Sequence, residues 1–258
     1  MLPEGYLVVA ADTEQSGQEV TEKMRAYLVD WLAELHFKFK MWQETLYVTI
    51  GIIDRFLAIT PDLKKSELQC LGITALHIAG KYEEIYPPEL KNLLRVTDNA
   101  VSKSEIIDME FRVLFKLQFA VTFPSSYRFL ERFCRLAQVS EKHFTLAQYF
   151  TDTSLLDCRL QREKPSRVAA VSLYISMTLL QNSEDANQLS CRQRMSNSLW
   201  TPTMINSTGY REEDIHQMSK DLLQFVKKIE KSQLKTFYKK YNDQRFSKVA
   251  QLIGHIEV

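Results

Sequence analysis

Acid, base and thiol side chains are spread along this sequence in no pattern that supports catalysis. The sequence contains no HExxH pair for a metal, no GxxxxGK(S/T) loop for a phosphate and no GxSxG turn around a serine. The adjacent carboxylates Glu83 and Glu84 indicate a solvated helix end rather than an acid–base couple. The histidines and cysteines are His36, His77, His143, His216, His255, Cys70, Cys134, Cys158 and Cys191, and their spacing fits neither a zinc site nor a disulfide framework. We therefore expect no catalytic residue, no metal site and no cofactor.

The charges nearly cancel. Lysine and arginine number 33 and aspartate and glutamate 32, so the formal net charge is +1 at pH 7. Because each neutralised phosphate needs a cationic side chain, we do not expect nucleic acid as a partner. No apolar run approaches the roughly 18 residues of a membrane span, so we expect no membrane association and a place in the cytosol or nucleus. We interpret the cations near the C-terminus as a solvated helix face rather than a binding site, and they are Lys227, Lys228, Lys231, Lys235, Lys239 and Lys240.

Apolar residues recur at steps of three and four, which is the period of an α-helix. One such series runs through Leu68, Leu71, Ala75, Ile78 and Tyr82. No stretch alternates between apolar and polar residues as a half-buried strand does. The chain also has only 7 glycines, against about 18 for average usage at this length. The pattern predicts an all-α protein.

Helix boundaries can be placed from caps and prolines. Ser66 followed by Gln69, and Ser102 followed by Glu105, have the spacing of capping boxes. We expect helices near 22–39, 43–60, 65–83, 88–95 and 102–118, and then near 126–138, 142–160, 165–181, 198–206 and 211–230. The two groups of five match in order when one is moved by about 100 residues. This repeat predicts two tandem five-helix bundles.

The expected divisions follow from that repeat. They are an N-terminal segment over 1–21, a first bundle over 22–122, a second bundle over 123–230 and a C-terminal tail over 231–258, with a polar surface loop at 182–197. Small residues recur in the third helix of each group, and they include Gly72, Gly80, Ala169 and Ser172. Because small side chains allow close backbone approach, we expect each third helix to be the central one.

Four segments in the first half carry a resemblance to a known family. Residues 24–32 read MRAYLVDWL, 44–47 read ETLY, 53–57 read IDRFL and 81–89 read KYEEIYPPE. In order and spacing they resemble the MRAILVDWL, ETLYLA, IDRFL and KFEEIYPPE segments of A- and B-type cyclins. The resemblance is weaker in the second half, where Thr208, Gly209 and Tyr210 are the best match. The fold of that family is a doubled five-helix bundle, the cyclin box repeated.

The resemblance implies a regulatory subunit and not an enzyme. Cyclins bind a cyclin-dependent protein kinase and push its C-helix inward, so that the kinase's Lys–Glu pair and metal-binding segment align the ATP phosphates. For this chain it implies a role in the cell cycle at G2/M, in the nucleus and cytoplasm. Only 23 residues precede Met24, and we expect them to lack the extra helix and the degradation signal that family members carry there.

The resemblance also assigns a kinase-binding face. Lys81 and Glu110 match the cation and carboxylate that anchor the kinase, where they would satisfy backbone groups that lose water on docking. The alternative for these two residues is an ordinary structural salt bridge. The apolar part of the face would consist of Tyr82, Ile85, Leu114, Phe119 and Val121.

A second surface implied by the resemblance is a substrate-docking groove for Arg-x-Leu peptides of substrates or inhibitors. Its residues would be Met24, Tyr27, Leu28, Trp31, Leu68 and Gln69, with Glu34 receiving the arginine. The alternative is that this stripe is simply helix core. Tyr27 stands where most mitotic cyclins have Ile, which leaves the docking specificity open. Arg25 and Asp54 match a structural ion pair between the first two helices.

Two other functions share the fold class. One is a helical adaptor in transcription that contacts nucleic acid through the basic residues near the C-terminus. The other is a scaffold that keeps the fold without activating any kinase. The near-zero net charge disfavours the first, and the presence of both Lys81 and Glu110 disfavours the second.

Overall fold

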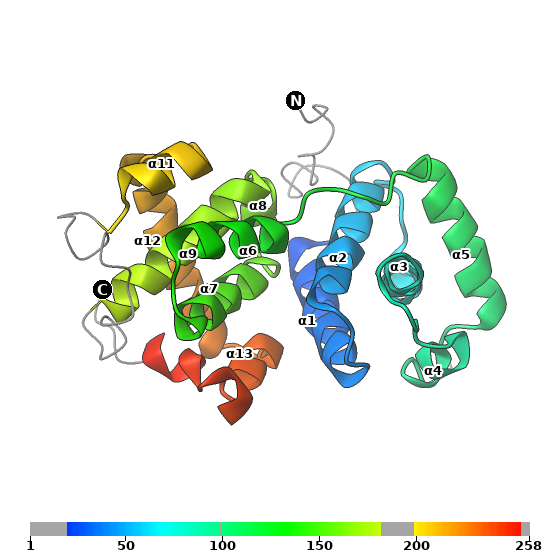
Figure 1. Ribbon diagram of the computed structural model, residues 1–258. Helices are drawn as coiled ribbons and strands as arrows, with labels where there is room; N and C mark the ends of the chain where they lie inside the picture. Colours follow the sequence, from blue (N-terminus) through cyan, green and yellow to red (C-terminus); the bar gives the residue numbers. More distant parts are fainter. Residues whose placement is uncertain (1–19, 99, 182–198, 254–258) are drawn as a thin grey trace. The chain divides into compact units, whose positions relative to one another are not determined.

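The computed structural model describes residues 20–98, 100–181 and 199–253, and within these ranges all regular structure is helical (Figure 1). The chain forms two compact units. Among the described residues, one consists of residues 20–98 and 100–123 together with Leu156–Arg162, and the other of Pro124–Leu155 together with residues 163–181 and 199–253. The prediction of an all-α chain with two tandem bundles is confirmed. The residues 1–19 and the expected loop at 182–197 lie outside the described residues.

The first unit is built around α3 (Leu68–Glu83). Around it lie α1 (Glu22–Lys38), α2 (Gln43–Ala58), α4 (Leu90–Arg95) and α5 (Lys103–Lys116), and each of them packs against α3. Figure 1 looks along α3, with α1 and α2 on one side and α5 on the other. Close approach is visible at Gly72, where an added Cβ would lie 2.7 Å from Leu28 Cδ1. The expected central position of this helix is therefore correct.

Capping explains the start of α5 and of the 3₁₀ turn that precedes α3. Ser102 Oγ accepts a hydrogen bond from the Glu105 N–H at 3.2 Å, and Glu105 Oε2 accepts one from the Ser102 N–H at 2.7 Å. The other expected box, Ser66 with Gln69, is wrong. Ser66 lies inside a 3₁₀ turn over Lys65–Glu67, and Glu67 accepts from the Lys64 N–H at 3.1 Å instead.

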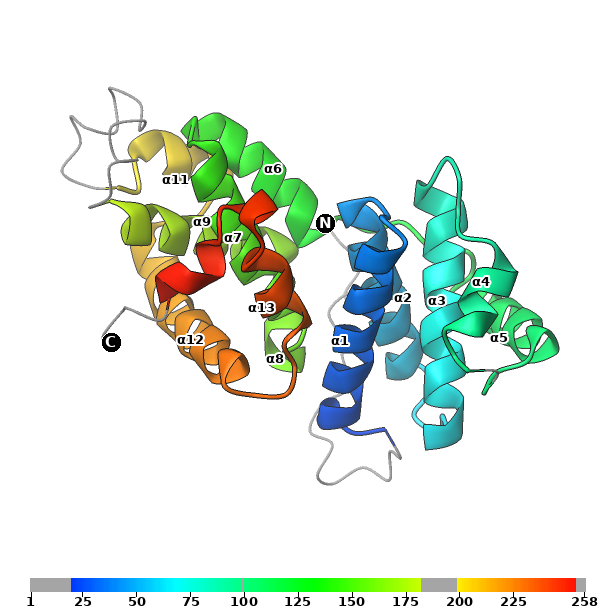
Figure 2. The ribbon, with the colours of Figure 1, turned by 90° about the horizontal axis from the view of Figure 1, so that it is seen from below.

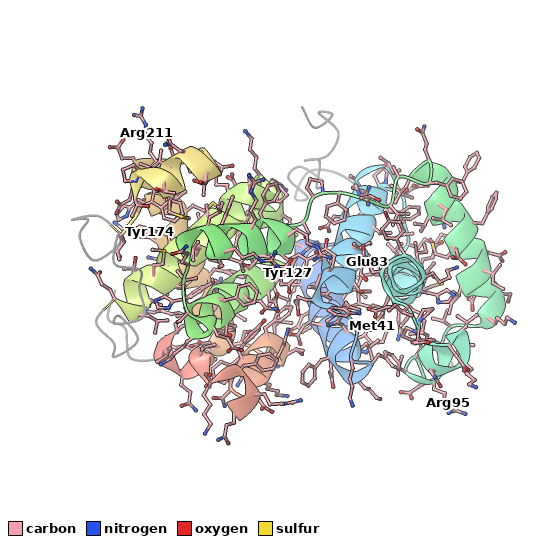
Figure 3. The ribbon with its side chains drawn as sticks, in the orientation of Figure 1. Met41, Glu83, Arg95, Tyr127, Tyr174 and Arg211 are labelled. Carbon is pink, nitrogen blue, oxygen red and sulfur yellow. The ribbon has the colours of Figure 1, made fainter. Side chains whose placement is uncertain are left out.

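The second unit is built around α9 (Pro165–Leu180), which packs against α6, α7 and α12. Its other helices are α6 (Ser126–Ala137), α7 (Glu141–Ser154), α11 (Pro202–Thr208), α12 (Glu212–Glu230) and α13 (Thr236–Tyr241), followed by 3₁₀ turns at Gln244–Phe246 and Val249–Ile253. Tyr174, labelled in Figure 3, donates a hydrogen bond to Glu212 Oε1 at 2.6 Å and so ties α9 to α12.

The expected helix over 142–160 is broken. α7 ends at Ser154, and a separate short helix, α8 (Cys158–Gln161), follows and belongs to the first unit. Ser154 Oγ donates to the Thr151 carbonyl at 2.7 Å, and Asp157 Oδ1 accepts from the Arg159 N–H at 2.9 Å. These side chains offer the backbone local partners that compete with a continuous helix.

Residues 231–253 pack into the second unit, while Lys228, Lys231, Lys235 and Lys239 are exposed, as expected for solvated cations. α12 ends at Glu230, so the basic residues do not share one helix face. Lys240 Nζ lies 3.0 Å from Asp152 Oδ2, and the Tyr241 hydroxyl donates to the same oxygen at 2.7 Å. Asp152 and Tyr241 are fully buried, as is Phe237. Figure 2 shows α13 folded against the second bundle, and residues 231–253 contribute Phe237, Tyr241, Val249, Ala250 and Ile253 to the core of that unit.

A buried ion pair joins α1 to α2. Arg25 Nε lies 2.6 Å from Asp54 Oδ1, and Arg25 Nη2 lies 2.7 Å from Asp54 Oδ2. Both residues are buried. Burial alone would lower the pKa of Arg25, but Asp54 raises it above its ordinary value, so the guanidinium stays charged.

Asp54→Ala is expected to lower the free energy of unfolding by about 3–5 kcal/mol, because it leaves the Arg25 charge buried without its carboxylate. Asp62→Ala, at an exposed turn of the same unit, is the control and should change it by less than about 0.5 kcal/mol. Urea unfolding followed by circular dichroism measures both. Equal losses in the two variants would contradict the assignment.

Candidate protein-binding site

An ion pair between α3 and α5 lies at the surface of the first unit. Lys81, in the last turn of α3, donates a hydrogen bond from Nζ to Glu110 Oε1, midway along α5. The side chains are 45% and 19% exposed, so another protein can reach them. The cation lies near the negative end of the α3 dipole, which stabilises it there. The structure thus brings together the two residues that the resemblance assigns to kinase anchoring.

Exposed apolar side chains lie close in sequence to this pair. Tyr82, Ile85 and Phe119 are exposed and Leu114 is half-buried. The Tyr82 hydroxyl has a hydrogen-bond partner in Thr122 Oγ1. Tyr86, which the resemblance does not assign to this face, is also exposed.

Val121 does not fit its expected role as part of an exposed apolar face. It is 9% exposed, and its carbonyl accepts a hydrogen bond from Arg55 Nη2 at 3.1 Å. Its side chain therefore belongs to the core of the unit, and its backbone helps to hold the segment that follows α5.

Arg55 positions that segment. It donates from Nη1 to the Ala120 carbonyl at 2.5 Å, and its guanidinium lies 5.0 Å from the centre of the Phe123 ring. Phe123 in turn covers Gly51, where an added Cβ would lie 2.1 Å from the ring. These contacts fix the turn that presents Phe119, whose φ is 58°. The sequence motif contains Arg55, but only the fold reveals this role.

Glu84 is a helix cap, which corrects its interpretation as a solvated helix end. Its Oε1 accepts hydrogen bonds from the Trp42 N–H at 2.7 Å and from Thr45 Oγ1 at 2.5 Å. Trp42 lies just before α2, where backbone N–H groups have no partner inside the helix, and Thr45 lies in the first turn and donates through its hydroxyl group. The contact fixes the chain beyond Lys81 and so positions Ile85.

The packing of Met41 supports the same region. Gly80, immediately before Lys81, has the Met41 methyl group 3.2 Å from where a Cβ would lie, and prolines 87 and 88 are close by. Met41 and Glu83, the last residue of α3, are labelled in Figure 3. The end of α3 is therefore enclosed on its inner side and exposed at Lys81.

His77 lies one helical turn before Lys81. It is half-buried, and among the described residues its Nδ1 atom has no hydrogen-bond partner. Burial lowers its pKa, the charge of Lys81 lowers it further, and Glu110 acts in the opposite direction. The imidazole is therefore neutral at physiological pH.

The residues expected to form the docking groove lie on α1 and α3, which pack against each other. Leu28 and Leu68 are buried, and the Leu28 side chain covers Gly72. Met24, Trp31 and Gln69 are half-buried, whereas Tyr27 and Glu34 are exposed. The two leucines thus form the floor of this face. Its accessible groups are the aromatic rings of Tyr27 and Trp31, the thioether of Met24, the amide of Gln69 and the carboxylate of Glu34.

A cavity of about 360 Å³ lies in the second unit, where α6 ends and α7 begins. None of the expected site residues lines it. Its lining residues are Glu131, Cys134, Arg135, Gln138, Val139, Ser140, Glu141 and Phe144. Across the part of the chain that the structure describes, no three His, Cys, Asp or Glu side chains converge to hold a metal ion, and no helix has the length and apolarity of a membrane span.

Comparison with known proteins places these features in a family. The family model described as cyclin, N-terminal domain, matches residues 6–122, and the model described as cyclin, C-terminal domain, matches residues 124–254. The chain belongs to the cyclin family. Both halves of the doubled bundle are thus accounted for, including the second, where the sequence motifs are weak.

The similar proteins include mitotic cyclins. The chain is 37% identical to the G2/mitotic-specific cyclin-B of Spisula solidissima, over 91% of this chain and 51% of that protein. It is 36% identical to the G2/mitotic-specific cyclin-B1 of Xenopus laevis, over 94% of this chain and 58% of that protein. The chain therefore spans between half and three fifths of these relatives.

A solved structure shares the fold. The crystal structure of a viral cyclin from herpesvirus saimiri matches with a TM-score of 0.65 and 18% sequence identity, over 86% of this chain and 90% of that one. At this identity the match concerns the fold alone.

The pKa of His77 provides a test of the Lys81–Glu110 geometry. Lys81→Ala is expected to raise this pKa, because it removes a neighbouring positive charge, and Glu110→Ala is expected to lower it. NMR titration of the imidazole measures both changes. Lys91→Ala, an exposed lysine on α4, is the control and should leave the His77 pKa unchanged. Shifts of the same sign in the first two variants would show that the pair does not flank His77.

Proposed function

We propose that this chain is a non-catalytic regulatory subunit that binds and activates a cyclin-dependent protein kinase at G2/M. The observation that carries the proposal is the exposed Lys81–Glu110 pair, which has apolar side chains around it and lies in a chain of the cyclin family. Relatives named as G2/mitotic-specific cyclins support the timing. The corresponding location is the nucleus and cytoplasm.

The chemistry of the pair suits a loop of protein backbone as ligand. A lysine ammonium has three N–H donors and a carboxylate accepts several hydrogen bonds, so the pair can bind carbonyl and amide groups while staying intact. A kinase loop held in this way would position the C-helix that follows it. That helix carries the glutamate of the kinase's Lys–Glu pair, and inward movement completes the ATP site. Catalysis belongs to the kinase.

The α1–α3 face is the proposed docking site for Arg-x-Leu segments of substrates or inhibitors. The exposed carboxylate of Glu34 would receive the arginine, and the half-buried Met24 and Trp31 would contact the leucine. Tyr27, with an exposed phenol, adds a hydrogen-bonding group at the rim. Peptides with a polar group opposite Tyr27 are the preferred ligands on this proposal.

A nucleic-acid adaptor is the weaker candidate. Its basic surface would need Lys240, which is paired with the buried Asp152, and α12 ends before the remaining C-terminal lysines. A scaffold that binds a kinase without activating it has the same surface, and a phosphorylation assay distinguishes it from an activator.

Lys81→Ala and Glu110→Ala are each expected to weaken kinase binding by about 2–5 kcal/mol, because the partner's backbone groups lose their charged ligand. This corresponds to roughly thirtyfold to a few thousandfold in Kd. Calorimetry with a purified recombinant mitotic cyclin-dependent kinase, and histone phosphorylation by the complex, measure binding and activation. Lys91→Ala is the control for general loss of surface charge. Unchanged binding in both site variants would refute the interface, and binding without activation would favour the scaffold.

Glu34→Gln is expected to weaken binding of an Arg-x-Leu peptide by a few-fold, the range of an exposed ion pair worth up to about 1 kcal/mol. A matched Ala-x-Leu peptide should bind the wild type and the variant equally, because it has no cation for Glu34. Fluorescence anisotropy measures all four combinations. The same loss with both peptides would mean that Glu34 does not receive the arginine.

A further inference from the structure

Three large apolar side chains on α5 remain outside the kinase-binding set that the resemblance implies. Ile107, Phe111 and Phe115 are 49%, 69% and 68% exposed. The two phenylalanine rings stack, with centroids 5.8 Å apart and an interplanar angle of 16°. We name these three residues the α5 stripe. A soluble protein rarely exposes several large apolar side chains side by side unless they bind something.

The stripe lies on the side of α5 that faces away from its unit. Ile106, Met109 and Val113 are the buried residues of this helix. At about 100° per residue, Phe111 and Phe115 point roughly opposite to that buried face. No packing role within the unit therefore explains their size.

The stripe is continuous with the Lys81–Glu110 pair. Side chains three or four residues apart are neighbours on a helix surface. Ile107 is a neighbour of Glu110 and Phe111, and Leu114 links Glu110 to Phe111. A partner that covers the ion pair and Leu114 thus extends directly onto Phe111 and Phe115.

We infer that the α5 stripe extends the apolar part of the kinase interface beyond Leu114 and contributes a large share of its affinity, while Lys81 and Glu110 set the orientation of the kinase. This inference rests on the proposed function. Its occupant is the kinase because the stripe is continuous with the proposed anchor. A stable interface buries about 800 Å² on each partner, far more than one ion pair provides. Two phenylalanines that are already stacked lose little side-chain freedom on binding, so their burial is efficient.

The test uses the double variant Phe111→Ser with Phe115→Ser in the full chain, and a purified recombinant mitotic cyclin-dependent kinase. The Kd is expected to rise at least thirtyfold, as for the loss of a buried aromatic hot spot. The double variant should keep the salt dependence of wild-type binding, whereas Lys81→Ala should reduce it. Ile59→Ser, at another exposed apolar position of the first unit, is the control and should leave the Kd unchanged. Circular dichroism checks that the variants remain folded.

The outcomes separate this inference from the proposed function. If Lys81→Ala weakens binding and the double variant binds within threefold of the wild type, the stripe is not part of the interface, but the proposed function stands. A different result would be that the wild type self-associates in sedimentation, while the double variant is monomeric and binds the kinase with an unchanged Kd. The occupant of the stripe would then be a second copy of the chain, and the inference would be overturned. If the wild type binds no cyclin-dependent kinase, both proposals fail.

Discussion

Close packing around α3 positions the two helices, α1 and α5, that carry most of the candidate binding residues of the first unit. Gly72 lets Leu28 of α1 lie directly on the helix, and Gly80 leaves room for Met41 just before Lys81. A larger side chain at either position would push a neighbouring helix outward, because protein interiors have almost no free volume. The cap that Glu84 provides for α2 then fixes the chain beyond the end of α3. The proposed kinase-binding face and the proposed docking face both depend on α3, because α5 packs against one side of this helix and α1 packs against another.

In each unit a buried carboxylate also binds a neighbouring helix through hydrogen bonds and an ion pair, which fix the position of that helix more specifically than apolar packing does. In the first unit Asp54 receives both arms of Arg25. In the second, Asp152 receives Lys240 and the Tyr241 hydroxyl, and burial next to this carboxylate raises the pKa of Tyr241. A buried charge with all its partners costs little, whereas one that has lost a partner is strongly destabilising. The two carboxylates therefore tie α1 to α2 and α13 to α7 through specific polar contacts.

Local patterns in the sequence predict the helices well, but they predict the contacts between distant residues poorly. Apolar periodicity identifies α3, and the Ser102–Glu105 spacing identifies the start of α5, because these signals are local. The break at Ser154 depends on side chains that compete for the backbone, which periodicity does not register. The roles of Glu84, Arg55 and Lys240 depend on partners 42, 65 and 88 residues away. Val121 shows the same limit, since an apolar residue at a family position can be either core or surface until the fold decides.

The state of the Lys81–Glu110 pair in the free chain determines what a partner can gain from it. With side chains 45% and 19% exposed, the pair is screened by water and contributes little to folding. It is nevertheless already formed, so a partner does not have to order two long side chains on binding. A partner that covers it removes water from the charges and strengthens their hydrogen bonds to the partner's backbone, because the local dielectric falls. The apolar side chains beside the pair are what exclude that water. The ion pair contributes little to the stability of the free chain, and we expect it to contribute to binding only when the exposed aromatic side chains are covered with it. Neither feature needs to stabilise the unbound protein.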